Sequence, residues 1–126
     1  MFVFGSNLAG RHGKGAALFA RQRRGARYGQ GEGFQGNAYA IPTKDVQLRT
    51  LHLDQIKRHV DRFLAFAADR ADLCFQVTAI GCGLAGYSPR QIAPMFAHAP
   101  LNCTLPSEFQ RELATLSPSL NGDNQP

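Results

Sequence analysis

Two glycine-rich loops hold the residues best suited to binding an anion. One spans residues 8–17 and the other residues 81–87, and each lies between an apolar run and a helix-like segment. Glycine has no Cβ, so main-chain N–H groups in such loops can converge on a ligand. The N-terminus of the following helix adds further N–H groups and a positive dipole end. The loops therefore predict an anion site, foremost for a diphosphate, although glycine-rich turns also serve tight packing alone.

Lys44 is the candidate catalytic residue. It follows Thr43 at the end of a short apolar segment, and open α/β sheets bind ligands beyond the carboxyl ends of their strands. A lysine there can pair with phosphate or, when partly desolvated, act as an amine nucleophile. The alternative is a solvated surface lysine beside Asp45.

Four other residues of these loops have both a chemical and a structural interpretation. Asn7 can bond ribose hydroxyls or cap a turn, and Tyr87 can stack on a base or ribose or anchor its loop. His12 can orient a phosphate or move a proton, but a lone histidine in a loop is more often a surface residue. Cys82 would need a partner histidine to act as a nucleophile, so we interpret it as part of the binding loop.

The spacing of the remaining histidines and cysteines predicts no metal site. His52, His59 and His98 lack metal-ligand spacing and are expected to be structural or solvent-facing. Cys74 and Cys103 fall within strand-like patterns and are expected in the core. The odd total of 3 cysteines predicts free thiols, which are typical of a reducing compartment such as the cytoplasm.

Hydrophobic patterning predicts strands that alternate with helices. Strands are expected at residues 2–4, 39–42, 73–80 and 102–105, and helices at residues 16–24, 53–71, from Pro89 onward, and 106–116. Pro42 is expected to stop the second strand, the third strand to be the longest, and Ser107 to cap the last helix. Residues 25–37 are expected to form an irregular surface loop.

This alternation predicts a three-layer α/β/α fold with a mainly parallel sheet. The apolar first strand is expected at the centre of the sheet. Both glycine loops and the corner at Thr43 and Lys44 would then emerge at the same edge. Residues 1–116 are expected to form a single domain, and residues 117–126 have the composition of a flexible tail.

Composition favours an anionic partner and excludes a membrane span. The chain has 126 residues and a formal net charge of +5, which suits an anionic ligand or a nucleic acid. Part of this charge comes from Arg21, Arg23, Arg24 and Arg27. The chain contains no run of 18 apolar residues, and its first residues lack the pattern of a signal peptide.

Two groups of residues, taken together, resemble macrodomains. The first is Phe4-Gly5-Ser6-Asn7 with Gly13-Lys14-Gly15-Ala16-Ala17, and the second is Ala40-Ile41-Pro42-Thr43-Lys44 with Ile80-Gly81-Cys82-Gly83-Leu84. The second group is similar to one branch of that family. This branch contains the terminal ADP-ribose glutamate glycohydrolases and the antitoxin macrodomains that remove ADP-ribose from thymidine in DNA.

The resemblance implies a minimal macrodomain that binds ADP-ribose without a cofactor. Lys44 would act at the anomeric carbon, Asn7 would approach the distal ribose, and the two loops would hold the diphosphate. The ligand-binding residues that it implies are Asn7, Gly13, Lys14, Gly15, Ala16, Thr43, Gly81, Cys82, Gly83, Leu84, Ala85, Gly86 and Tyr87.

One departure bears on the substrate. Glutamate-hydrolysing members carry an aspartate after the Gly-Cys-Gly-Leu run, whereas this chain has Ala85. The DNA-directed antitoxins have glycine there, so the departure counts more against the first kind of relative than the second. The chain also begins directly at the first ligand-bearing strand, and it lacks the earlier strands that supply an acidic residue to the adenine.

Three functions remain open at this point. The first is hydrolysis of an ADP-ribosyl linkage on a protein or a nucleic acid. The second is a non-catalytic reader or sponge for ADP-ribose-like signal nucleotides, and the third is an RNA-binding α/β module.

Overall fold

The computed structural model describes residues 1–116 and shows an α/β fold built on one mixed sheet. The tail predicted for residues 117–126 lies outside the described residues. The strands are β1 (Phe2–Asn7), β2 (Gly33–Gln35), β3 (Ala38–Lys44), β4 (Phe75–Val77) and β5 (Cys103–Thr104). The helices are α1 (Gly15–Arg23), α2 (Leu53–Asp69), α3 (Pro89–Ile92), the 3₁₀ helix η1 (Ala93–Phe96) and α4 (Ser107–Leu116). None of these helices is long and apolar enough to span a bilayer.

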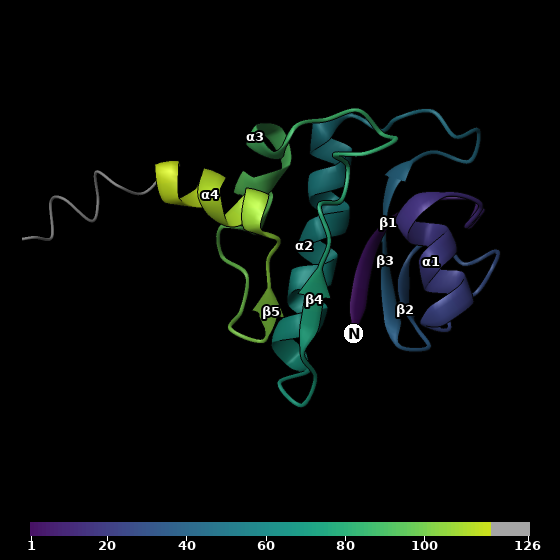
Figure 1. Cartoon of the computed structure of the whole chain (residues 1–126), viewed down its shortest axis with the longest axis horizontal. Coiled ribbons are helices and arrows are strands. Elements are labelled where there is room, and N and C mark those ends of the chain that lie inside the picture. The colour runs from purple at the N-terminus through teal and green to yellow at the C-terminus, as the bar shows by residue number, and fades with distance from the viewer. Residues whose placement is uncertain (117–126) are drawn as a thin grey trace, which may run out of the picture.

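The sheet is ordered around β1. Its order is β2-β3-β1-β4-β5, in which β1 pairs in parallel with β3 and β4, and β4 pairs in parallel with β5. Only β2 is antiparallel, against β3. The central position predicted for the first strand is therefore confirmed, and the carboxyl ends of β1, β3 and β4 point to one edge of the sheet (Figure 1).

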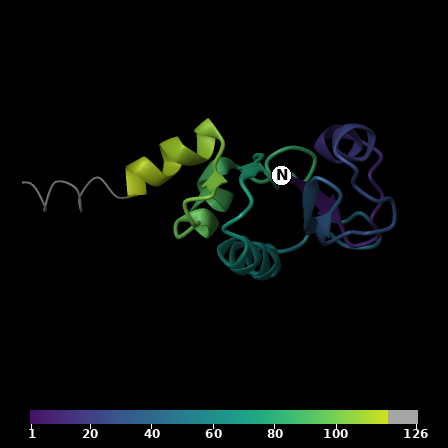
Figure 2. The same ribbon diagram turned by 90° about the horizontal axis from the view of Figure 1, so that it is seen from below.

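The helices pack on both faces of the sheet. Seen along the sheet, α1 lies on one side and α2 on the other, while α3, η1 and α4 gather beside β5 (Figure 2). Strand alternation explains this arrangement, because successive side chains point to opposite faces. Phe4 packs with the alanines of α1, whereas Val3 faces the apolar stripe of α2 formed by Ile56, Val60 and Phe63.

The strand predicted at residues 73–80 is wrong in length. β4 covers only Phe75–Val77, and β3 is the longest strand. The chain turns away after Val77, because Thr78 donates both its backbone N–H and its hydroxyl to the carbonyl of Val3, and Ile80 N–H then bonds Thr78 O. Cys74, expected in the core, is exposed.

Two errors of the sequence prediction concern β3. Pro42 does not stop this strand, which continues to Lys44. Pro42 lies beyond the residues that pair with β2, and the register between β3 and β1 shifts next to it, so a residue without an N–H is tolerated there. Residues 25–37 are not irregular throughout, since β2 forms a hairpin with β3 through a turn at Gly36, whose φ is +55°.

The later helices also depart from their predicted forms. The segment from Pro89 is divided into α3 and η1, and Pro94 lies at the start of η1. The last helix begins at Ser107 itself, and the carbonyl of Pro106 accepts its first hydrogen bonds from Phe109 and Gln110.

Close backbone contact joins the first glycine loop to residues 29–31. A Cβ built on Gly31 would lie 2.2 Å from Asn7 O, and one built on Gly10 would lie 2.3 Å from the carbonyl carbon of Gly29. The hydroxyl of Ser6 also donates to Gly31 O. These contacts leave no room for side chains, so the two glycines are required for packing.

We expect Gly31→Ala to lower the free energy of unfolding by roughly 1–3 kcal/mol, because backbone on both sides of the added methyl group must move. Gly13→Ala is the matched control, since a Cβ on Gly13 meets nothing within 4 Å, and it should change stability by less than about 0.5 kcal/mol. Urea unfolding measures both. Equal stability of the two variants would contradict this account of the contact.

Candidate functional site

A cleft of about 310 Å³ opens at the edge where β1, β3 and β4 end. The β1–β4 ladder stops at Val3 and Val77, and the cleft begins directly beyond it. Its lining residues are Gly5, Ser6, Asn7, Arg11, Lys14, Gly15, Ala16, Ala17, Thr43, Lys44, Thr78, Ala79, Ile80, Gly81, Gly83, Leu84 and Ala85. Its volume is at the lower end of the range for small-molecule sites.

The N-terminus of α1 forms one wall of the cleft. Lys14 occupies the N-cap position, but its side chain makes no capping hydrogen bond. The backbone N–H groups of Gly15, Ala16 and Ala17 donate to no acceptor within residues 1–116. Uncapped N–H groups at the positive end of a helix dipole bind anions.

The loop after β4 forms the opposite wall. The N–H groups of Gly81, Gly83, Leu84 and Ala85 also lack an acceptor in the described part of the chain. Gly81 has a φ of +76°, which turns the chain back toward the cleft and favours glycine. Thr50 holds this wall in place, because its hydroxyl donates to Ala85 O at 3.0 Å.

The charged side chains that line the cleft are all cationic. They are Arg11, Lys14 and Lys44, and no Asp, Glu or His is among the described lining residues. Lys44 is half-buried and forms no ion pair with any residue in 1–116. The neighbouring Asp45 instead pairs with Arg49 at 3.2 Å.

Asp45 is engaged in its own turn. Its carboxylate accepts the backbone N–H groups of Gln47 and Arg49, and bonding by the Arg49 backbone lowers the pKa of this carboxyl. The turn carries Leu48 at a φ of +65°, an uncommon conformation for a non-glycine residue. The arrangement leaves Lys44 as the titratable side chain nearest the end of β3 that faces the cleft.

Asn7 and Thr43 hold the floor of the cleft together. The Asn7 side chain donates to Arg11 O and accepts from Arg11 N–H, both at 2.9 Å, so it braces the first glycine loop. The hydroxyl of Thr43 donates to Ser6 O at 3.3 Å, which joins β3 to β1. Both residues are buried, and both line the cleft.

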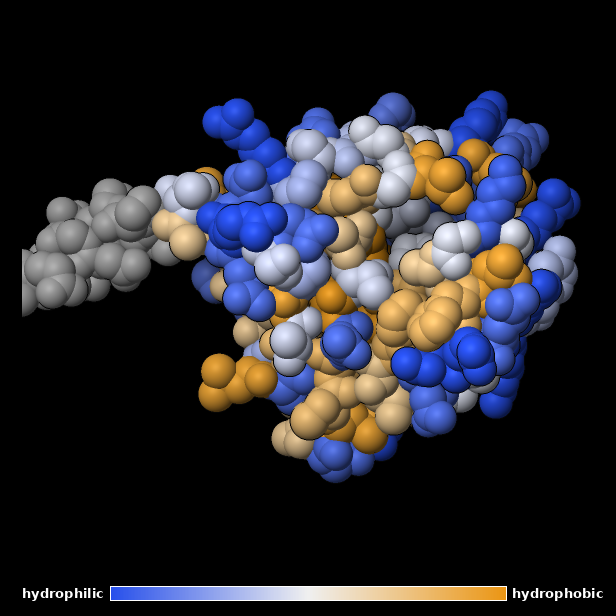
Figure 3. Space-filling view, viewed as in Figure 1, coloured by the Kyte–Doolittle hydropathy of each residue, from blue (hydrophilic) through white to orange (hydrophobic). Residues whose placement is uncertain are grey.

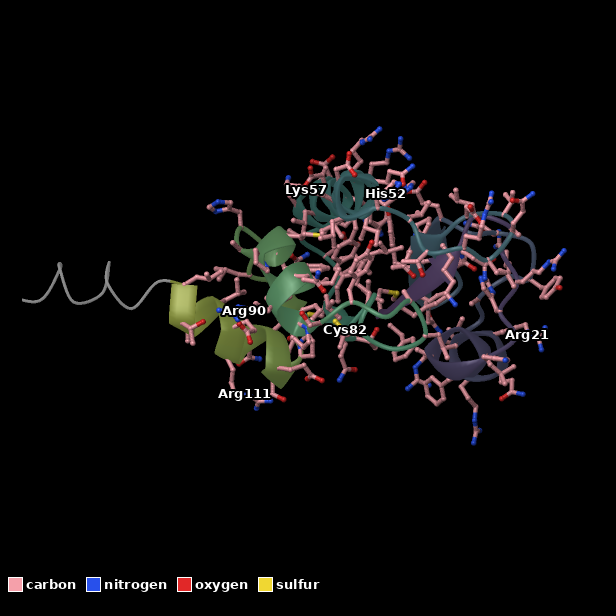
Figure 4. All side chains as sticks on the ribbon, turned by 90° about the horizontal axis from the view of Figure 1, so that it is seen from above. Arg21, His52, Lys57, Cys82, Arg90 and Arg111 are labelled. Carbon is pink, nitrogen blue, oxygen red and sulfur yellow. The ribbon has the colours of Figure 1, made fainter. Side chains whose placement is uncertain are left out.

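Four predicted binding residues do not line the cleft: Gly13, Cys82, Gly86 and Tyr87. Cys82 packs against the core beneath its loop (Figure 4), and burial raises the pKa of its thiol to about 11, which disfavours the thiolate. Tyr87 acts as the loop's anchor, because its hydroxyl donates to Leu51 O at 2.7 Å.

Several lining residues were not found from the sequence. Ser6, Arg11 and Thr78 were missed. For Ser6 the available signal was its place at the end of the first strand beside Asn7. Thr78 was taken as strand interior, because the early end of β4 was not recognised.

His12 lies below the cleft wall and not at the surface, where it was predicted. It is fully buried, and neither ring nitrogen has a hydrogen-bond partner among the described residues. Its ring meets Phe4 edge to face at 5.3 Å. Burial lowers the pKa of His12 and nearby Arg21 lowers it further, although the Gln30 backbone acts in the opposite direction.

Comparison of the chain with protein-family models, curated proteins and solved structures finds no match. The residues of the cleft itself therefore carry the functional argument.

We expect His12 to make stability fall in acid. Its pKa is lower in the folded state than in the unfolded state, so the unfolded state binds the proton more tightly. Folding stability should be fully present above the ordinary histidine pKa of about 6.5 and decrease as the pH falls below it. Urea unfolding between pH 8 and pH 5 measures this dependence.

The variants identify the titrating group. His12→Leu should lose this part of the pH dependence, whereas His98→Gln, which changes an exposed histidine, should retain it. Identical pH profiles for wild type and His12→Leu would show that His12 does not titrate on unfolding.

Proposed function

We propose that the protein is a small macrodomain-like ADP-ribosyl hydrolase that binds ADP-ribose or a related nucleotide in this cleft. The observation that carries the proposal is the pairing of two walls of unbonded N–H groups with three cations and no carboxylate. Such a lining suits a diphosphate, which presents oxygen acceptors on both sides. The three-layer α/β/α arrangement of macrodomains belongs to the same proposal, and helices on both faces of the sheet support it.

Lys44 is the residue that we assign to the reaction. In the simplest mechanism, its amine attacks the anomeric carbon of the ribose, and the bond from that carbon to the linked group breaks with the electron pair leaving on that group. Water then releases ADP-ribose and restores the amine. Alternatively, Lys44 acts as an ammonium ion that stabilises charge developing in the transition state.

A second function is favoured by the lack of carboxylates in the cleft. Position 85 holds alanine, and no other acid among the described residues lines the site. Without an acid or base beside Lys44, the same cleft would bind ADP-ribose and leave its linkage intact. The protein would then act as a reader or sponge for ADP-ribose-like nucleotides.

The Lys44 variants distinguish these functions. We expect Lys44→Ala to slow release of ADP-ribose from modified DNA or protein by about 10²-fold or more, while calorimetry still detects ADP-ribose binding. Lys44→Arg keeps the cation but not the nucleophilic amine, so partial activity would identify the ammonium mechanism and its loss the covalent one.

Lys57→Ala is the control for these measurements. Lys57 pairs with Asp61 on α2, away from the cleft (Figure 4), and its removal should leave both binding and release unchanged. Tight ADP-ribose binding by an enzyme preparation that releases nothing would support the reader. Absence of ADP-ribose binding would overturn both functions.

Gly83 provides a separate test of the binding wall. It lines the cleft, its φ is not in the left-handed region, and a Cβ there meets nothing within 4 Å. Gly83→Val should therefore fold normally but weaken ADP-ribose binding by about ten-fold or more, because the added side chain covers the N–H groups. Ala97→Val, an exposed change beside η1, is the control in the same titration. Unchanged affinity in Gly83→Val would place the ligand elsewhere.

A further inference from the structure

The excess positive charge of the protein is confined to one part of the chain. Residues 1–31 contain Arg11, Lys14, Arg21, Arg23, Arg24 and Arg27 but none of the 9 Asp and Glu residues. From residue 32 onward, the acidic residues slightly outnumber Lys and Arg. The charge is therefore a local feature, centred on α1 and the loop that follows it.

The arginines at the C-terminal end of α1 are interleaved with exposed aromatic rings. The guanidinium carbon of Arg24 lies 4.9 Å from the ring centre of Phe19, and that of Arg21 lies 5.4 Å from the ring centre of Tyr28. Tyr28 is 62% exposed and Phe19 is 40% exposed. Strongly hydrophilic and hydrophobic residues accordingly alternate over α1 on the right-hand side of Figure 3.

These arginines have no acidic partners. No Asp or Glu within residues 1–116 lies within ion-pair distance of Arg21, Arg23, Arg24 or Arg27. By contrast, Arg49, Arg58, Arg62 and Arg70 all have such partners elsewhere in the molecule. The cations near α1 are thus available to an external polyanion.

We propose that this arginine–aromatic patch, formed by Phe19, Arg21, Arg23, Arg24, Arg27 and Tyr28, binds single-stranded nucleic acid. Proteins hold single strands by combining cations along the phosphate backbone with aromatic rings on which unpaired bases stack. Exposed rings beside arginines match both requirements, whereas a duplex keeps its bases stacked inside.

The patch is distinct from the cleft and independent of the function proposed for it. The N-terminal end of α1 lines the cleft and its C-terminal end carries the patch, so nine residues, or about 13 Å of helix, separate them. Arg21 points outward from α1, far from Arg90 and Arg111 at the other end of the molecule (Figure 4). ADP-ribose should therefore not compete with a strand bound at the patch.

The first experiment removes phosphate contacts. Fluorescence anisotropy with a labelled oligothymidine, and in parallel an oligouridine, measures affinity across salt concentrations. Arg23→Gln/Arg27→Gln should weaken binding about ten-fold and reduce the slope of log affinity against log salt by about 1.4, at roughly 0.7 per phosphate contact. Arg90→Gln/Arg111→Gln changes the net charge equally and should have little effect.

The second experiment removes stacking. Tyr28→Ala should weaken oligonucleotide binding about five-fold or more without changing the salt slope, and Tyr28→Phe, which keeps the ring, should retain affinity. Binding should persist in Lys44→Ala and in excess ADP-ribose. These two conditions separate failure of the patch from failure of the cleft.

Three results would overturn the proposal. One is an equal loss of affinity in the two double-arginine variants, which would indicate a general charge effect. Another is full displacement of the oligonucleotide by ADP-ribose, which would place the strand in the cleft. The third is binding to anionic phospholipid vesicles but not to either oligonucleotide, which would assign the patch to a membrane surface.

Discussion

The short ladder between β1 and β4 is the constraint on which the site depends. These strands pair only at Phe2 with Gln76 and at Val3 with Val77, whereas β1 pairs with β3 along its whole length. Because Thr78 then binds the carbonyl of Val3 with two hydrogen bonds, the chain cannot continue as a strand beside Gly5. The sheet divides at this point, and the division is the cleft.

This division also explains which residues reach the site. Chain connections leave β1 through α1 on one face and β3 through α2 on the other, so the edge beyond β1 is where the topology changes direction. The glycine loops approach from either side and contribute N–H groups instead of side chains. Since Asp45 is held by Arg49 and by its own turn, the only charges that line the cleft within the described residues are positive.

Local patterns were sufficient to predict the alternating α/β elements, the central first strand and the edge at which Lys44 meets the loops. They were not sufficient where long-range contacts decide the outcome. β2 has only three residues and forms because β3 lies beside it, Pro42 is tolerated by a register shift with β1, and β4 ends through bonds to Val3. His12 is buried by contact between loops that the sequence cannot place against each other.

The same helix connects the two surfaces to which we assign ligands. α1 buries Ala17 and Ala20 against Phe4 and the alanines of β3, so small side chains hold it close to the sheet while nearly all of its larger ones face solvent. Such a helix contributes little hydrophobic stabilisation for its length, because alanine buries little apolar area. Its sequence is therefore explained less by packing than by what its surfaces bind. Its N-terminus presents uncapped N–H groups to the cleft, and its C-terminus presents unpaired arginines beside aromatic rings, both of which are suited to phosphate.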